Sequence, residues 1–395
     1  MINRVLILSP IPLTRKIYDN FYIDQLILAG IKVEFIDFSD MFSIGDLHKH
    51  ELNYAGTIKV SGKKAFNNIL KRYSAESDCL IFSTFSYCYQ FLFIYRILKK
   101  YKFPVAFMAR GAMPSFQLLQ TNINRNLILI SKLINPIKCI RICQTIITLI
   151  FKKIGLTKKI EVIFQAGIYG LRAIGTGYQM DVKSADKIIG INYFDYDQYI
   201  QIQLNRKNTM PADKYVVFLD EYLPYHPDFD LLSMKKVNAE TYYKELNLFF
   251  DYVERSLNTK VIIAAHPKSV YDVNPFEGRL ISINQTAEVV SNSRLVLAHS
   301  STSISFAVCF NKKVLLLSSK EIRSINGGYL HNSLLGFSEA LELEWVDITT
   351  SPNIDLKKIE INRQKYESYL YSYLTNPDSE KRQTQEIFLE YLISK

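Results

Sequence analysis

Acidic residues are absent from one long part of this 395-residue chain, since no Asp or Glu occurs between Cys79 and Ile160. The same part holds 13 Lys and Arg residues and carries +13, so the rest of the chain carries about −3 of the total of +10. A basic excess of this kind indicates nucleic acid, an acidic substrate or an anionic membrane as a partner. The residues that interleave these charges distinguish the three.

Cysteine is scarce, with five residues at positions 79, 88, 139, 143 and 309. An odd number in apolar surroundings argues against a disulfide framework, and Cys139 and Cys143 lack the second pair that a zinc site requires. A secretory signal is missing too, because residues 1–10 are typical of a strand that runs into a loop. We therefore expect a cytosolic protein with reduced thiols.

Short apolar runs alternate with helical stretches along the chain, of which 48% is hydrophobic and 13% aromatic. This composition excludes a disordered protein, and the length predicts two domains. The alternation predicts βαβ units, and hence parallel sheets in an α/β fold. We expect a first domain over 1–205, a second over 206–360 after a polar linker near 203–213, and C-terminal helices over 361–395 that pack back on the first domain.

Three polar motifs in the second half each follow an apolar run that predicts a buried strand. The runs are 214–219, 260–265 and 294–298, and the motifs are Asp220-Glu221, His266-Pro267-Lys268 and Ser300-Ser301-Thr302. Open α/β sheets place their ligand sites at the carboxyl ends of the strands. The three motifs therefore predict one crevice that binds a phosphate-bearing nucleotide.

The order and type of these motifs resemble bacterial GT-B glycosyltransferases that transfer sialic acid and related ulosonic acids from CMP-sugars. The resemblance covers about 216–317, and Tyr222 stands where that family usually has glycine. It implies two Rossmann-like, doubly wound domains that face each other across a cleft. It also implies a CMP-sugar donor and a reaction without a metal or other cofactor.

Two motifs offer groups for the nucleotide phosphate. The resemblance implies that His266 contacts the phosphate of CMP, and an imidazolium there would stabilise the developing charge; Pro267 fixes the turn and Lys268 adds a charge. The alternative is that His266 has only a structural role and makes a hydrogen bond at the end of the strand. Ser300, Ser301 and Thr302 precede an apolar helix, where hydroxyls cap free amides or bind an anion. We prefer phosphate binding.

Carboxyl groups supply the remaining candidates. An acceptor hydroxyl must lose its proton as it attacks, so Asp220 or Glu221 is the expected general base, with Asp220 first because it ends the strand directly. The resemblance implies that an acid near Glu288 binds the ribose. An acidic residue that only stabilises the N-terminus of a helix explains Glu288 equally well. We exclude His226 from the nucleotide role because no strand precedes it.

The acid-free part includes a basic, aliphatic segment over about 123–160. Its lysines and Pro136 argue against a spanning helix and favour two amphipathic helices at an anionic membrane surface. A core helix with solvated lysines is the alternative. Aliphatic rather than aromatic residues separate the charges, which argues against nucleic acid.

Together these features predict a cytoplasmic glycosyltransferase, peripheral at the inner face of the plasma membrane. It would move an ulosonic acid of the sialic or Kdo type from a CMP-sugar to a bacterial surface glycan or its lipid-linked precursor. The alternatives are a transferase with another donor, such as CDP-glycerol or a UDP-hexose, and a catalytically silent, membrane-bound glycan-binding subunit.

Overall fold

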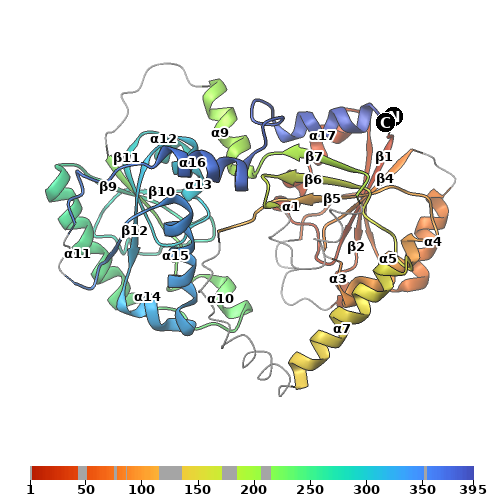
Figure 1. The fold of residues 1–395 in the computed structure, drawn as a ribbon, viewed down its shortest axis with the longest axis horizontal. Coiled ribbons are helices and arrows are strands. Elements are labelled where there is room, and N and C mark those ends of the chain that lie inside the picture. Colours follow the sequence, from red (N-terminus) through yellow and green to blue (C-terminus); the bar gives the residue numbers. More distant parts are fainter. Residues whose placement is uncertain are drawn as a thin grey trace. The chain divides into compact units, whose positions relative to one another are not determined.

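A computed structural model of the chain describes residues 2–42, 51–74, 78–85, 87–114, 136–170, 185–205, 215–350 and 354–395. These residues form two compact units, each built around one sheet (Figure 1). The first unit contains Met1–Ala112, Gln120–Asn192 and Thr375–Lys395. The second consists mainly of Tyr193–Leu374.

The sheet of the first unit has seven parallel strands in the order β3-β2-β1-β4-β5-β6-β7. The strands are β1 (Arg4–Ser9), β2 (Lys32–Asp37), β3 (Thr57–Lys59), β4 (Cys79–Ser83), β5 (Val105–Ala109), β6 (Val162–Ala166) and β7 (Lys187–Ile191). The helices are α1 (Arg15–Asn20), α2 (Ile23–Leu28), α3 (Ser39–Phe42), α4 (Lys63–Tyr73), α5 (Leu92–Leu98), α7 (Pro136–Lys153) and α17 (Thr384–Ile393). A 3₁₀ turn, Tyr89–Phe91, precedes α5.

Helix α17 returns from the C-terminal end of the chain to this first sheet. Its Phe388 is fully buried, with its ring centroid 5.1 Å from that of Phe82 and 5.4 Å from that of Phe164. The amide of Ile2 donates a hydrogen bond to the carbonyl of Leu392 at 2.9 Å, so the two ends of the chain meet (Figure 1). Residues from both ends of the sequence therefore complete this core.

The second sheet has six parallel strands in the order β10-β9-β8-β11-β12-β13. They are β8 (Tyr215–Leu219), β9 (Val261–Ala264), β10 (Ile281–Ser282), β11 (Ser293–Ala298), β12 (Lys313–Ser318) and β13 (Trp345–Asp347). The helices are α9 (Phe194–Asn205), α10 (Pro227–Leu231), α11 (Ala239–Leu257), α12 (Thr286–Ser291), α13 (Ile304–Cys309), α14 (Lys320–Ser324), α15 (Tyr329–Leu341) and α16 (Arg363–Tyr369). Shorter turns are Ile325–Gly328 and Leu370–Leu374.

Helices cover both faces of the second sheet, and its central strand β8 has Val-Val-Phe-Leu buried over residues 216–219, as expected for a strand covered on both faces. Successive residues of a strand point to opposite faces. Val216 and Phe218 of β8 accordingly pack in the core beneath α11. Val217 and Leu219 pack with residues of α9, α12, α13 and α15. This layering confirms the predicted α/β fold of two Rossmann-like, doubly wound sheets, the pair from which the GT-B fold is built.

The division of the chain differs from the sequence-based boundaries at 205 and 361. Tyr196 and Ile200 of α9 and Tyr366 and Tyr369 of α16 pack in the core of the second unit. Apart from a short stretch after Ala112 that is grouped with the second unit, the chain passes to that unit after Asn192 and returns to the first after Leu374. The expected boundary at 205 rested on the polar composition of the stretch that follows α9. The boundary lies before α9 instead, because the apolar face of this helix packs on the second sheet.

The basic segment contains one long described helix, α7. The first of the two expected interfacial helices falls on 123–135, which lies outside the described residues. Along α7 the isoleucines at 140, 142, 146, 147 and 150 are exposed, while Thr148 is buried. Within the described residues, no helix combines the length and the apolar character needed to cross a membrane.

Candidate functional site

The three polar motifs follow three adjacent strands of the second sheet. β8 lies between β9 and β11, so Asp220, His266 and Ser300 emerge at one edge. The strand order reverses between β8 and β11, because β9 and β10 continue on one side of β8 and β11, β12 and β13 on the other. Ligands of doubly wound sheets bind at such a reversal, outside the carboxyl ends of the strands.

Asp220 is held firmly at the end of β8. Its side chain accepts a hydrogen bond from the amide of Tyr222 at 3.0 Å on one oxygen and from the Tyr271 hydroxyl on the other, and the residue is only 3% exposed. Burial raises the pKa of Asp220, and hydrogen bonds from Tyr271 and from backbone amides, including that of His266, lower it in part. Both carboxyl oxygens are therefore engaged within the protein.

Glu221 spans the point at which the strand order reverses. Its Oε1 accepts the amide of Ser300 at 2.6 Å, and its Oε2 accepts the Ser300 hydroxyl at 3.3 Å. Burial raises the pKa of Glu221 to about 7, and the nearby charge of Asp220 acts in the same direction. At neutral pH this carboxyl exchanges a proton readily, as a general base or acid must.

Tyr222 takes the left-handed backbone conformation, with φ of +53°. A residue with a side chain costs about 1 kcal/mol or more there. The Tyr222 hydroxyl donates to the carbonyl of Val270 at 2.9 Å, and its ring meets that of Tyr271 edge-on at 5.4 Å. Tyr222 thus adopts a conformation that usually favours glycine. Its side chain connects the loop after β8 to the loop after β9.

His266 is half-buried in the loop after β9. Its Nδ1 accepts the amide of Lys268 at 3.1 Å, so the neutral ring carries its proton on Nε2. The Lys268 ammonium lies 2.7 Å from Asp228, and both Pro267 and Lys268 are exposed. The motif therefore presents one imidazole donor, with a paired lysine beside it.

The hydroxyls after β11 have different partners. Ser300 bonds to Glu221, as described, whereas the Ser301 hydroxyl accepts the amide of Ser303 at 3.2 Å. The Thr302 carbonyl accepts the Ser305 hydroxyl at 2.8 Å, and Thr302 is exposed. Ser301 thus orders the turn before α13, which is close to the capping alternative that the sequence suggests.

Glu288 and His299 differ in their exposure to solvent. Glu288 is exposed in the first turn of α12, the helix after β10. His299 is buried between the carbonyl of Leu317, 2.7 Å from its Nδ1, and the Tyr242 hydroxyl, 3.0 Å from its Nε2. Burial lowers the pKa of His299 to about 4. This ring packs beneath the loop that follows β11.

Tyr271 is a site residue that sequence reasoning missed. It donates to Asp220 and faces Tyr222, but it follows His266 in an irregular loop with no periodicity or motif. A buried carboxyl such as Asp220 requires hydrogen-bond donors. This requirement is the one feature of the sequence that could have pointed to a nearby hydroxyl such as that of Tyr271.

No cluster of three or more His, Cys, Asp or Glu suitable for a metal occurs among the described residues. Asp195, one of two nearby carboxylates on α9, instead accepts a hydrogen bond from the Ser305 hydroxyl, and Asp197 is buried. The expectation that no metal participates remains a prediction.

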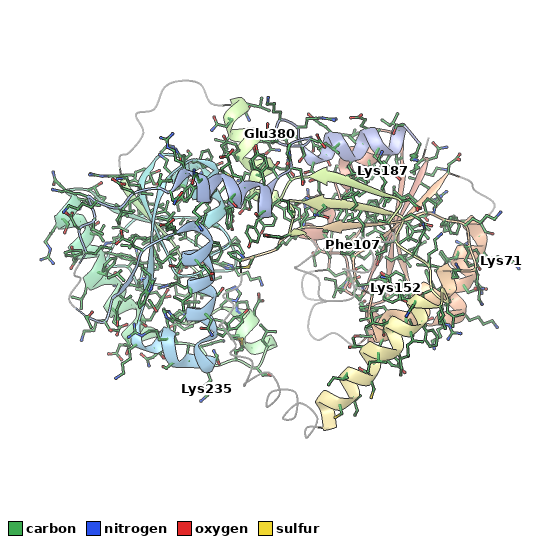
Figure 2. The ribbon with its side chains drawn as sticks, viewed as in Figure 1. Lys71, Phe107, Lys152, Lys187, Lys235 and Glu380 are labelled. Atoms are coloured by element: carbon green, nitrogen blue, oxygen red, sulfur yellow. The ribbon has the colours of Figure 1, made fainter. Side chains whose placement is uncertain are left out.

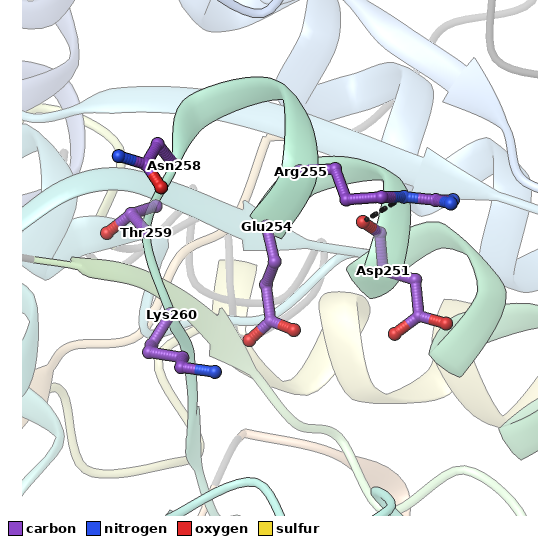
Figure 3. Close-up of a pocket in the computed structure, with 6 residues that line it drawn as sticks. All are labelled: Asp251, Glu254, Arg255, Asn258, Thr259 and Lys260. Carbon is purple, nitrogen blue, oxygen red and sulfur yellow. Dashed lines mark hydrogen bonds between the residues drawn. The ribbon is translucent and has the colours of Figure 1, made fainter.

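A cavity of about 520 Å³ lies at the opposite end of the second sheet (Figure 3). It is lined by the last turn of α11 and the residues that lead into β9, among them Glu254 and Lys260. Arg279 lies 2.5 Å from Asp251 and 3.0 Å from Glu254, so these carboxylates already have a partner. This cavity lies at the amino ends of the strands, away from the three motifs.

No protein-family model matches the sequence, and a search of curated proteins finds no relative. Among solved structures, the chain is similar to the wall teichoic acid polymerase TagF (10% identity, TM-score 0.49, 99% of this chain and 89% of that one). It is also similar to UDP-GlcNAc 2-epimerase from Methanocaldococcus jannaschii (13%, 0.46, all of both chains) and to MurG from Acinetobacter baumannii (9%, 0.42, all of both chains). At these values the likeness concerns the fold, and we take no activity from it.

Proposed function

We propose that the protein is a glycosyltransferase that moves an ulosonic acid, of the sialic or Kdo type, from a CMP-sugar to a bacterial surface glycan. One observation carries the proposal. A carboxyl with a pKa of about 7, an imidazole donor and a group of hydroxyls follow the carboxyl ends of three neighbouring strands, where the order of the second sheet reverses. Group transfer from a nucleotide-sugar needs a base for the acceptor and donors for the departing phosphate.

Glu221 is the proposed general base, in preference to Asp220. Both carboxyls have two bonded oxygens, Asp220 to Tyr222 and Tyr271 and Glu221 to Ser300. Asp220 is nearly inaccessible, however, whereas Glu221 is more exposed and has a pKa close to neutral pH. The acceptor oxygen attacks the anomeric carbon while its proton passes to Glu221. The bond between that carbon and the phosphate oxygen breaks, and CMP departs with the electron pair. Asp220 orders the loop on which Glu221 sits.

The donor phosphate is assigned to His266, Ser301 and Thr302. The Nε2–H of His266 stabilises the charge that grows on the departing CMP, and Lys268, paired with Asp228, neutralises the charge of that acid beside the phosphate. We assign the ribose hydroxyls to Glu288, which is exposed in the first turn of α12 and could accept their hydrogen bonds. The scheme uses no metal ion, since these groups meet the phosphate charge.

Nucleotide binding tests the proposal most directly. At equal concentrations, CMP should raise the melting temperature more than CDP, UDP or GDP, because a ligand bound only by the folded state stabilises it by mass action. The measurement is a thermal-shift titration of the whole chain. An equal or larger shift with UDP would contradict the CMP donor and favour a UDP-hexose. CMP binding without transfer to any glycan acceptor would favour the glycan-binding subunit.

Helix α7 supports a membrane partner for this enzyme. Its exposed isoleucines are followed by Lys152, which Figure 2 labels on α7, and by Lys153. The surrounding part of the chain has no acid. Exposed aliphatic side chains beside basic ones suit the interface of an anionic bilayer. We place the protein at the cytoplasmic face of the plasma membrane, where a lipid-linked acceptor would be within reach.

A further inference from the structure

A second histidine lies against His266. The ring centroids of His226 and His266 are 4.6 Å apart, and the rings cross at 65°. His226 lies in the loop after β8 and His266 in the loop after β9, and these strands are neighbours. The sequence argued against His226 because no strand precedes it directly, but the loop after β8 carries it to the same edge.

The two imidazoles are fixed in the same way. The Nδ1 of His226 accepts the amide of Asp228 at 3.1 Å, and the Nδ1 of His266 accepts the amide of Lys268 at 3.1 Å. Each histidine is followed by a proline that restrains the turn. With Nδ1 used as an acceptor, each neutral ring carries its proton on Nε2. The pair therefore offers two N–H donors on adjacent rings.

Other contacts hold the two loops together. Lys268 lies 2.7 Å from Asp228, and the Tyr222 hydroxyl bonds to the carbonyl of Val270. The ion pair also neutralises Asp228, the acid next to the histidines. Donors fixed before a ligand arrives bind it without the cost of ordering them.

We propose that His226 binds the same phosphate group as His266, each through its Nε2–H. This inference rests on the proposed nucleotide donor and adds a residue to its binding site. A phosphate has several oxygens, so two adjacent donors bind it better than one. Both hydrogen bonds strengthen as negative charge develops on the departing phosphate.

Two substitutions of His226 separate phosphate binding from its structural role as the cap of α10. His226→Asn keeps an acceptor at the position of Nδ1 and preserves the cap, but it removes the Nε2–H. His226→Gln places an amide donor near the position of Nε2. Titration calorimetry of the full chain with CMP, UMP and cytidine then measures what the phosphate contributes.

We expect His226→Asn to weaken CMP binding about ten- to hundredfold, as for the loss of one hydrogen bond to a charged group. Cytidine binding and the melting temperature of the free protein should not change, and His226→Gln should recover part of the affinity. Wild-type affinity in His226→Asn, or an equal loss for cytidine, would overturn the inference.

The same titrations distinguish the inference from the donor assignment. If wild type binds UMP as tightly as CMP, and His226→Asn weakens both, His226 is a phosphate ligand and the CMP assignment is wrong. If wild type prefers CMP and His226→Asn keeps that affinity, the donor assignment stands and the inference is wrong. If wild type binds neither monophosphate, both are wrong.

Discussion

Asp220 and Glu221 are neighbours in the sequence with different surroundings in the fold. The Asp220 carboxyl turns under the loop toward Tyr271, and the Glu221 carboxyl turns toward β11 and Ser300. Burial raises the pKa of both groups, to about 7 for Glu221. Two adjacent carboxyls thereby have different partners, and we propose that one orders the loop while the other takes part in proton transfer.

Replacement of each carboxyl identifies the base. Glu221→Gln keeps an acceptor for the Ser300 amide but cannot take a proton, so turnover should fall by about 10²- to 10⁴-fold while CMP affinity hardly changes. In wild type, kcat/KM should rise with pH through about 7, because the base must be ionised, and this rise should vanish in the variant. If Asp220→Asn instead abolished the rise of kcat/KM with pH and Glu221→Gln were fully active, Asp220 would be the general base.

At the scale of elements, α7 is notable because it exposes several isoleucine side chains to solvent. Thr148 is buried and Phe151 packs under Arg96, with the guanidinium 5.4 Å from the ring centroid, while most of its isoleucines remain exposed. The Lys152 ammonium lies 4.6 Å from the Tyr87 ring centroid and so takes part in packing. Lys153, at the end of the helix, has no such ring beneath it among the described contacts.

The exposed face of α7 predicts binding to anionic vesicles that two kinds of substitution should weaken. Ile146→Ser with Ile150→Ser removes buried apolar area in the bilayer, and Lys138→Gln with Lys153→Gln removes about 1 kcal/mol of attraction per charge. Co-sedimentation with vesicles measures both effects.

Leu248→Ser provides the control, since Leu248 is 61% exposed on α11 and belongs to the second unit, outside the acid-free part of the chain. It should leave vesicle binding intact. Binding unchanged by both pairs of α7 substitutions would instead indicate that α7 is an ordinary surface helix with solvated lysines.

At the scale of the whole molecule, the first unit is completed only by the end of the chain. Phe388→Ala removes a fully buried ring that faces Phe82 and Phe164, and such truncations cost about 3–5 kcal/mol of the free energy of unfolding. Urea unfolding followed by fluorescence measures the loss. Ile393→Ala, at a half-exposed position of the same helix, should change stability little; equal losses in both variants would argue against the packing of α17 described here.

The sequence by itself determined the strands and the placement of Asp220, His266 and Ser300 at their carboxyl ends, because continuous apolar runs between polar residues are a local property. It also indicated the return of the C-terminal helix. Only the tertiary structure decided that β8 lies between β9 and β11, that Tyr271 bonds to Asp220, and that His226 faces His266. Strand order and the paths of irregular loops depend on packing between residues far apart in the chain, and no local pattern records them.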